Sequence, residues 1–118
     1  MTERATAAEP EDITRLFVER ASAGDAEGLA ALYEPGAVLA FPPGSEVTGR
    51  PAILAACRKL VAAGVPFRHE EPLPAVRFEN MALTSTRAAD GTGGRVQVAR
   101  RQADGSWLRI IDRPELPA

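Results

Sequence analysis

The hydrophobic pattern in the first half of the chain has the three-to-four-residue period of helices. The first predicted helix begins around Pro10, which suits a first turn, and ends at Gly24. A second, short helix follows Asp25, which can cap it, and ends at Pro35-Gly36. The third opens at Gly49-Arg50-Pro51 and ends at Gly64. Their apolar stripes are Ile13, Leu16, Phe17 and Ala21; Leu29, Leu32 and Tyr33; and Ile53, Leu54, Cys57, Leu60 and Val61.

Beyond the third helix the period changes from helical to alternating, which predicts strands. Asp90-Gly91 and Asp104-Gly105-Ser106 are typical of tight hairpin turns. The order helix, helix, strand, helix and then an antiparallel meander predicts an α+β fold, in which helices and sheet are segregated. The predicted strands are Ala37–Phe41, Phe67–Glu71, Met81–Ala89, Arg95–Ala103 and Trp107–Arg113, with a weaker one at Val76–Glu79.

The composition fits one ordinary globular domain. The chain has 118 residues, of which 45% are hydrophobic and 25% are charged. We expect the polar, Ala-rich residues 1–9 to be a flexible tail and residues 10–118 to form a single domain. Thirteen arginines against one lysine, together with abundant alanine, are typical of a GC-rich bacterium and indicate no function.

Charge and residue counts exclude several classes of partner. The net charge is −2 and the arginines are scattered, so binding to nucleic acid is disfavoured. No apolar run approaches the ~20 residues that span a bilayer, and the N-terminus lacks the pattern of a signal peptide. We therefore expect a cytoplasmic protein without membrane contact. One histidine and one cysteine allow neither a disulfide within the chain nor a multi-histidine or thiolate metal site, and we expect no metal and no cofactor.

Several local motifs carry a family resemblance. They are the helix end and cap in 17–25 (FVERASAGD), the stretch 28–38 (GLAALYEPGAV), the helix start in 49–53 (GRPAI) and the last hairpin in 100–112 (RRQADGSWLRIID). Together they resemble the nuclear transport factor 2-like superfamily, in particular its SnoaL-like and ketosteroid isomerase-like bacterial branch of small uncharacterised members. The resemblance covers about residues 10–114. These motifs are mainly structural, so they indicate the fold better than the chemistry.

The resemblance implies a cone-shaped, curved antiparallel sheet, mostly a meander, packed on three N-terminal helices. It also implies an open apolar pocket and a homodimer built on the outer sheet face. The catalytic set of ketosteroid isomerases is not carried over, because Phe17 stands where the family has its oxyanion-binding tyrosine and Phe41 where it has its basic aspartate. The third group of ketosteroid isomerases is a carboxylic acid that stays protonated and donates a hydrogen bond, and Gln97 stands at about its place. The resemblance therefore excludes steroid isomerisation by that mechanism.

Asp112 and His69 are the candidate catalytic residues. Alternation on the last strand puts Leu108, Ile110 and Asp112 on one face. If that face is turned to the pocket, Asp112 is a carboxyl group in apolar surroundings, which suits a general acid or base, and SnoaL-like cyclases are similar in using an acid on a late strand. His69 can transfer protons near neutral pH. The alternatives are that Asp112 pairs with Arg87 or Arg113 and ends the strand, and that His69 is solvated or paired.

A second group of residues is predicted to bind the ligand. Ser85 and Gln97 can hydrogen-bond a carbonyl or hydroxyl, although alternation makes the neighbouring valines look more buried than Gln97. Arg87 can bind an anion or neutralise Asp112, or it can simply be solvated. Trp107 and Cys57 are assigned structural roles, as a packing anchor and a small buried side chain. The apolar lining comprises Leu16, Phe17, Phe41, Pro42, Leu83, Leu108 and Ile110, unless these side chains fill the interior completely.

Three functions remain open from the sequence. The favoured one is a protein that holds an apolar small molecule and carries out acid–base chemistry without a cofactor, such as cyclisation, isomerisation or dehydration. In that case Asp112→Asn and His69→Ala should abolish turnover with little change in melting temperature. The second is a non-catalytic ligand-binding or dimerisation module, and the third is a protein that binds another chain through its sheet face. The sequence does not decide whether the protein is an enzyme.

Overall fold

Three helices precede most of the sheet in the computed structural model, which describes residues 4–42, 44–64, 70, 72–87 and 93–116. Helices α1 (Asp12–Ser22) and α3 (Arg50–Ala62) form as their apolar stripes predict, and the short helix α2 spans Ala26–Ala30. The predicted cap is present, because the carboxylate of Asp25 accepts a hydrogen bond from the backbone N–H of Gly28 at 2.9 Å. Gly24 ends the α1 region with a φ of +72°, a backbone conformation that favours glycine.

Helix α2 is shorter than the sequence predicts. It stops at Ala30, and Tyr33, expected on its apolar face, instead begins strand β1, which spans Tyr33–Leu39. The guanidinium of Arg50 donates to the carbonyl oxygen of Tyr33 through Nε at 3.2 Å and through the second terminal nitrogen at 2.5 Å. The start of β1 is thus tied to the first turn of α3, and the tyrosine side chain is buried beneath the sheet rather than between helices.

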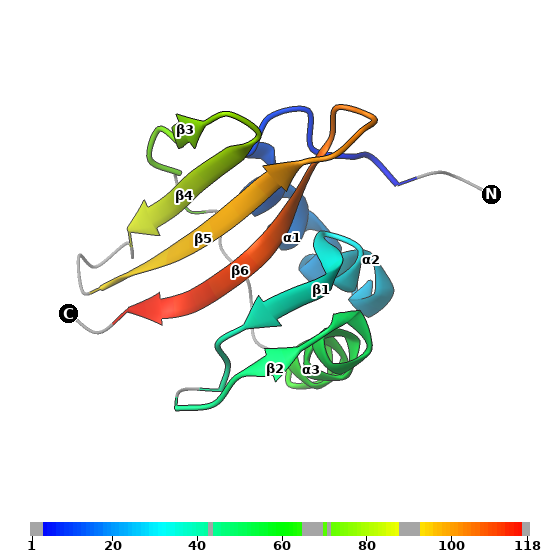
Figure 1. Ribbon diagram of the computed structural model, residues 1–118. Coiled ribbons are helices and arrows are strands. Elements are labelled where there is room, and N and C mark those ends of the chain that lie inside the picture. The colour runs from blue at the N-terminus through cyan, green and yellow to red at the C-terminus, as the bar shows by residue number, and fades with distance from the viewer. Residues whose placement is uncertain (1–3, 43, 65–69, 71, 88–92, 117–118) are drawn as a thin grey trace.

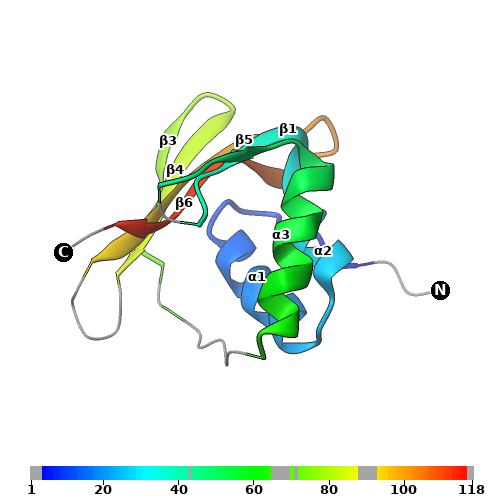
Figure 2. The same cartoon turned by 90° about the horizontal axis from the view of Figure 1, so that it is seen from below.

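The sheet has six strands in the order β2-β1-β6-β5-β4-β3. Strands β3 to β6 form the predicted antiparallel meander, and β1 joins it parallel to β6, with Val38 opposite Ile111. Figure 2 shows all three helices on one face of this sheet, which confirms the mixed α+β architecture, whereas the cone shape remains a prediction. The predicted strand at Phe67–Glu71 lies outside the described residues except for Glu70. The remaining strands are β2 (Val47–Thr48), β3 (Val76–Phe78), β4 (Met81–Arg87), β5 (Gly94–Arg101) and β6 (Trp107–Leu116).

Strand β6 contains an irregularity that changes which side chains face the helices. Opposite β5, Arg109 pairs with Ala99 and Ile111 pairs with Val98, so β6 has one extra residue, Ile110, between two neighbouring positions of β5. Trp107 and Arg109 are buried before the irregularity, and Asp112 is buried after it. The predicted shared face of Leu108, Ile110 and Asp112 is therefore wrong, because simple alternation does not survive an inserted residue.

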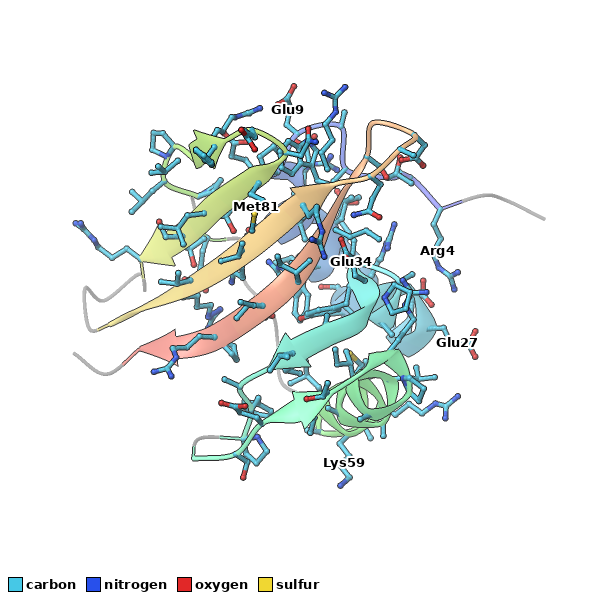
Figure 3. The ribbon with its side chains drawn as sticks, in the orientation of Figure 1. Arg4, Glu9, Glu27, Glu34, Lys59 and Met81 are labelled. Atoms are coloured by element: carbon cyan, nitrogen blue, oxygen red, sulfur yellow. The ribbon has the colours of Figure 1, made fainter. Side chains whose placement is uncertain are left out.

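Part of the N-terminal segment that we expected to be a tail is packed against the domain. Ala7 is buried, and its carbonyl oxygen accepts a hydrogen bond from the backbone N–H of Trp107 at 3.0 Å. Arg4, labelled in Figure 3, donates to the carboxylate of Asp25 at 2.8 and 3.0 Å. The described residues 4–9 thus extend the core at the edge where β6 begins. Among the helices described, none has both the length and the apolar character needed to cross a membrane.

Candidate functional site

Buried polar side chains form a row across the helix-covered face of the sheet. Thr84 on β4 lies opposite Gln97 on β5, and Gln97 lies opposite Asp112 on β6. All three are buried, and the Thr84 hydroxyl donates to the Gln97 side-chain oxygen at 2.8 Å. This face is otherwise the wall of the hydrophobic core, where polar groups normally require a partner. The row is therefore the first candidate for a functional site.

At the β6 end of this row, Asp112 contacts two further buried polar side chains. The hydroxyl of Tyr33 donates to Oδ2 of Asp112 at 2.5 Å, and a terminal nitrogen of Arg109 lies 3.4 Å from the same oxygen. The exposed fractions are 1% for Tyr33, 4% for Arg109 and 2% for Asp112. We call these three residues the buried triad. It is an ion pair that is shielded from water and carries one neutral hydrogen-bond donor.

The parallel pairing of β1 with β6 brings the buried triad together. Tyr33 lies opposite Arg109, and Leu39, six residues further along β1, lies opposite Asp112. The backbone N–H of Arg109 donates to the carbonyl oxygen of Leu32 at 2.9 Å, which fixes the start of β1 against β6. The extra residue in β6 then places Arg109 and Asp112 on the same face, although three positions separate them.

The electrostatics of the buried triad keep its two donors protonated. Burial, and secondly the charge of Asp112, raise the pKa of Tyr33 well above its ordinary value, so the hydroxyl keeps its proton. Burial, the largest single influence, would lower the pKa of Arg109, but the charge of Asp112 and the interactions with Tyr33 together outweigh it, and the pKa is raised. The rings of Phe17 and Tyr33 also lie over the guanidinium, 5.4 and 5.9 Å from its carbon. The arrangement is suited to holding a buried carboxylate in a fixed orientation.

The buried triad leaves hydrogen-bonding capacity unused. Among the described residues, four buried side-chain polar atoms have no hydrogen-bond partner: Oδ1 of Asp112, Nε of Arg109, Oγ1 of Thr86 and Oε2 of Glu70. Two of the four belong to the buried triad, and Thr86 lies two residues beyond Thr84 on the same face of β4. Unpaired polar groups of this kind destabilise a folded protein by about 1–3 kcal/mol each. Three of the four atoms therefore lie on the helix-covered face of the sheet.

The sequence-predicted residues divide between the two faces of the sheet. Asp112 and Gln97 lie on the inner face, where Gln97 is more buried than its valine neighbours, contrary to the alternation argument. Leu83, Ser85 and Arg87 are not part of this face, because on β4 the residues turned inward are Ala82, Thr84 and Thr86. His69 lies outside the described residues.

The predicted apolar lining is only partly on the inner side. Phe17 on α1 and Phe41 after β1 are partly buried and pack against the core, as a lining role requires, and Leu16 is fully part of the core. Leu108 and Ile110 are only partly buried, whereas Trp107 and Arg109 take the inward positions before the irregularity in β6. Pro42 is exposed.

Sequence reasoning missed Tyr33 and Arg109. Tyr33 was assigned to a helical stripe, and Arg109 to the outer face, because a buried arginine contradicts the hydrophobic pattern of a strand. An arginine and an aspartate three residues apart on one predicted strand lie on opposite faces unless a bulge intervenes, and nothing in the sequence marks that bulge.

Cys57 on α3 is buried close enough to this region for Asp112 to affect it. Burial, and secondly the charge of Asp112, raise the pKa of the Cys57 thiol to about 11. A thiol with that pKa is almost fully protonated at neutral pH and is a poor nucleophile. The predicted structural role of this cysteine therefore fits its surroundings.

Comparison with known proteins identifies the fold family. A family model described as SnoaL-like domain matches residues 14–112. The chain belongs to the SnoaL-like domain family. This places it within the nuclear transport factor 2-like superfamily and confirms the resemblance drawn from the local motifs. Among curated proteins, none matches the sequence.

This SnoaL-like domain is similar over most of its length to several solved structures. A protein from Thiobacillus denitrificans, assigned as a calcium/calmodulin-dependent protein kinase type II association domain, is 19% identical with a TM-score of 0.77, covering 98% of this chain and 99% of its own. A protein of the same superfamily from Streptomyces avermitilis, assigned as a dehydratase, is 17% identical with a TM-score of 0.67, covering 90% and 91%. A relative with a cystatin-like fold from Novosphingobium aromaticivorans is 22% identical with a TM-score of 0.63, covering 86% and 75%. At these identities the similarity establishes the fold and not the reaction.

Proposed function

We propose that this SnoaL-like domain binds a small, largely apolar molecule against the inner face of its sheet, and that Asp112 accepts a proton from it. The reaction would be an isomerisation, cyclisation or dehydration that needs no cofactor. One observation carries the proposal: Oδ1 of Asp112 is buried without a partner, while Oδ2 is held by Tyr33 and Arg109. A general base needs an oxygen with a free lone pair in a fixed position.

The surroundings of Asp112 support this role. Tyr33 donates a hydrogen bond to the carboxylate, and Arg109 supplies a buried countercharge beside it. Phe17 and Phe41, both partly buried, supply apolar surface at the positions where ketosteroid isomerases have catalytic polar groups. The fold also occurs in the Streptomyces avermitilis protein that is assigned as a dehydratase, although this likeness alone does not assign a reaction.

The exchange of an acidic C–H bond tests the proposal directly. The probe is 2-tetralone, an apolar bicyclic ketone whose protons next to the carbonyl are weakly acidic. In D₂O, the carboxylate of Asp112 would take a proton as the C–H bond breaks, and the bonding electron pair would pass to the carbonyl group to form an enolate. The carboxyl group would exchange its proton with solvent and return a deuteron to the enolate carbon as the C–D bond forms and the ketone is restored. Proton NMR follows the loss of the signal. We expect exchange above the protein-free rate, reduced roughly 100-fold in Asp112→Asn, as typical of a lost general base.

Control variants separate this role from general effects. Glu27→Gln changes an exposed carboxylate on α2 and should leave the exchange rate unchanged. Tyr33→Phe keeps the ring but removes the donor to Asp112, so the rate should fall less than in Asp112→Asn. Exchange at the protein-free rate, or equal rates in the unaltered protein and a folded Asp112→Asn variant, would contradict catalysis by Asp112. His69→Ala tests the remaining predicted catalytic residue, and an unchanged rate would remove it from the mechanism.

The second candidate function is ligand binding without chemistry. It is favoured by the two phenylalanines, because neither Phe17 nor Phe41 can transfer a proton at the positions that matter in ketosteroid isomerases. A phenol such as 2-naphthol could still donate to Asp112 and raise the melting temperature. If 2-naphthol raises the melting temperature while 2-tetralone exchanges no faster than without protein, ligand binding without chemistry is favoured over an enzyme.

We also propose that the outer face of the sheet packs against a second copy of the chain. Four apolar residues lie in register across neighbouring strands β3, β4, β5 and β6: Val76, Leu83, Val98 and Ile111. Val76, Leu83 and Ile111 are 66%, 43% and 50% exposed, and Figure 3 shows Met81 on the same side of the sheet. A second copy offers an identical apolar row, which is the self-complementarity that a two-fold dimer requires.

A further inference from the structure

Two of the unpartnered atoms in the buried triad are of opposite kind and belong to groups in contact. Oδ1 of Asp112 can only accept a hydrogen bond, and the Nε–H of Arg109 can only donate one. The side chains that carry them approach to 3.4 Å through other atoms of the same two groups. The buried triad thus presents one unused acceptor and one unused donor on two side chains that contact each other.

From this juxtaposition we infer that the ligand carries a neutral planar group with a hydrogen-bond acceptor and donor side by side, as in a lactam or a primary carboxamide. Its carbonyl oxygen would accept from Nε of Arg109, and its N–H would donate to Oδ1 of Asp112. The inference rests on the proposed function and specifies the chemical class of the ligand at the same site.

The charges of the buried triad favour a neutral ligand. An anionic group near Arg109 would also face the carboxylate of Asp112, and a cationic group near Asp112 would also face the guanidinium. Because both charges are buried and already balance one another, an added ion would be left without a counterion. A neutral amide satisfies both unused atoms and leaves this balance intact.

Groups with a single function satisfy only half of the site. An ether or tertiary amide accepts from Arg109 but has no proton for Asp112, so Oδ1 remains unpaired. A hydroxyl has its donor and its acceptor on one oxygen, whereas an amide has them on two atoms that can meet Oδ1 of Asp112 and Nε of Arg109 separately. Leaving a buried polar atom unpaired strongly disfavours binding, and selectivity against analogues that lack one hydrogen bond is correspondingly high.

The aromatic rings around Arg109 add a preference for a flat ligand. The ring of Phe17 lies over the guanidinium, and Phe17 is only partly buried whereas Arg109 is almost completely covered. Since the unused atoms are themselves covered, a ligand must displace part of this cover to reach them. A planar aromatic lactam can replace the Phe17 ring in the contact that it makes with the guanidinium.

Three bicyclic probes test the inference in the unaltered protein by isothermal titration calorimetry. The probe 2-quinolone has the adjacent carbonyl and N–H, 1-methyl-2-quinolone has only the carbonyl, and 2-naphthol is a hydroxyl compound of similar size. We expect 2-quinolone to bind at least about tenfold more tightly than either of the others. Arg109→Lys keeps the charge but removes Nε, and should weaken the binding of 2-quinolone and of 1-methyl-2-quinolone alike, whereas Glu27→Gln should change neither.

The outcomes separate this inference from the proposed function. Equal affinities for the three probes would contradict the lactam preference. They would not bear on proton transfer by Asp112, which the 2-tetralone experiment tests separately. An unchanged affinity for 2-quinolone in a folded Arg109→Lys variant would also contradict it, because the donor to the carbonyl oxygen would then lie elsewhere. If no probe binds while 2-tetralone exchanges, the lactam inference is wrong and the proposed function stands. If Arg109→Lys fails to fold, the comparison of probes in the unaltered protein still decides.

Discussion

Replacing Asp112 by asparagine should strongly destabilise the fold, contrary to the small change in melting temperature expected from the sequence, because the structure places Asp112 in a buried ion pair. Asparagine has nearly the same volume as aspartate and can still accept a hydrogen bond from Tyr33, so the change is almost entirely one of charge. Arg109 would keep its positive charge at 4% exposure but lose the carboxylate 3.4 Å away. Breaking a buried ion pair by neutralising one partner typically destabilises a protein by about 3–5 kcal/mol.

We expect the lower end of that range, about 3 kcal/mol, because the separation is longer than a short charge-assisted hydrogen bond and two aromatic rings still cover the guanidinium. For a domain of this size, that corresponds to a fall of roughly 12 °C in melting temperature. The fluorescence of Trp107, the single tryptophan and a buried one, reports unfolding in urea.

A double-mutant cycle isolates the ion pair. Arg109→Gln alone should also destabilise the protein, since it leaves the Asp112 carboxylate buried without its countercharge. The double variant has neither charge, so its loss of unfolding free energy should be smaller than the sum of the single losses by roughly 1–3 kcal/mol. Additive losses, or less than about 1 kcal/mol for Asp112→Asn, would refute the idea that the pair is a coupled buried unit.

Three further predictions concern other parts of the molecule. Burial raises the pKa of Cys57 from its ordinary value of 9 to about 11, so the stability that the thiol contributes is complete below pH 9 and is lost as the pH rises towards 11. Cys57→Ala should therefore flatten this part of the curve of unfolding free energy against pH, and an unchanged slope would contradict the prediction. Hydrogen bonding by Arg4 lowers the pKa of Asp25, so its contribution is present above about pH 4 and lost in more acidic solution. Asp25→Ala should destabilise the fold by about 1 kcal/mol in urea unfolding at pH 7, and Asp25→Asn by less, because asparagine can still cap α2. Leu83→Glu combined with Ile111→Glu should convert a dimer to a monomer in light scattering, and a monomeric unaltered protein would contradict the proposed interface.

The sequence predicted the helices and the meander because their signals are local. Helix α3 carries an apolar stripe between a Gly-Arg-Pro start and a glycine end, and the turn at 104–106 is held by Asp104, which accepts from the backbone N–H of Ser106 at 2.9 Å. The parallel pairing of β1 with β6 had no such signal, since it joins residues about 75 positions apart. Tyr33 was therefore assigned to the wrong element although its burial was expected.

The inward orientation of Asp112 was predicted for the wrong reason. Alternation assumed that Leu108 and Ile110 face inward with it, whereas the inward side chain before the irregularity is Arg109. The extra residue Ile110 reverses which side chains of β6 face inward. The prediction started from the wrong inward face and also missed the bulge, and these two errors compensate at Asp112. A bulge of this kind leaves no clear mark in a single sequence, because it is selected by the interactions it permits. Here those interactions are the contacts of Arg109 with Asp112 and with the two aromatic rings.

Stability alone does not account for the buried triad. Apolar side chains of similar size at positions 33, 109 and 112 would fill the same space without charges, and buried ion pairs are often no more stabilising than such replacements. The triad additionally leaves Oδ1 of Asp112 and Nε of Arg109 unpaired, which an apolar core would avoid. A simultaneous replacement of Arg109 and Asp112 by methionine and leucine, with Tyr33→Phe, should therefore retain or increase the unfolding free energy. If the same variant loses proton exchange and lactam binding while remaining folded, the physical reason for the triad is the ligand and not the fold.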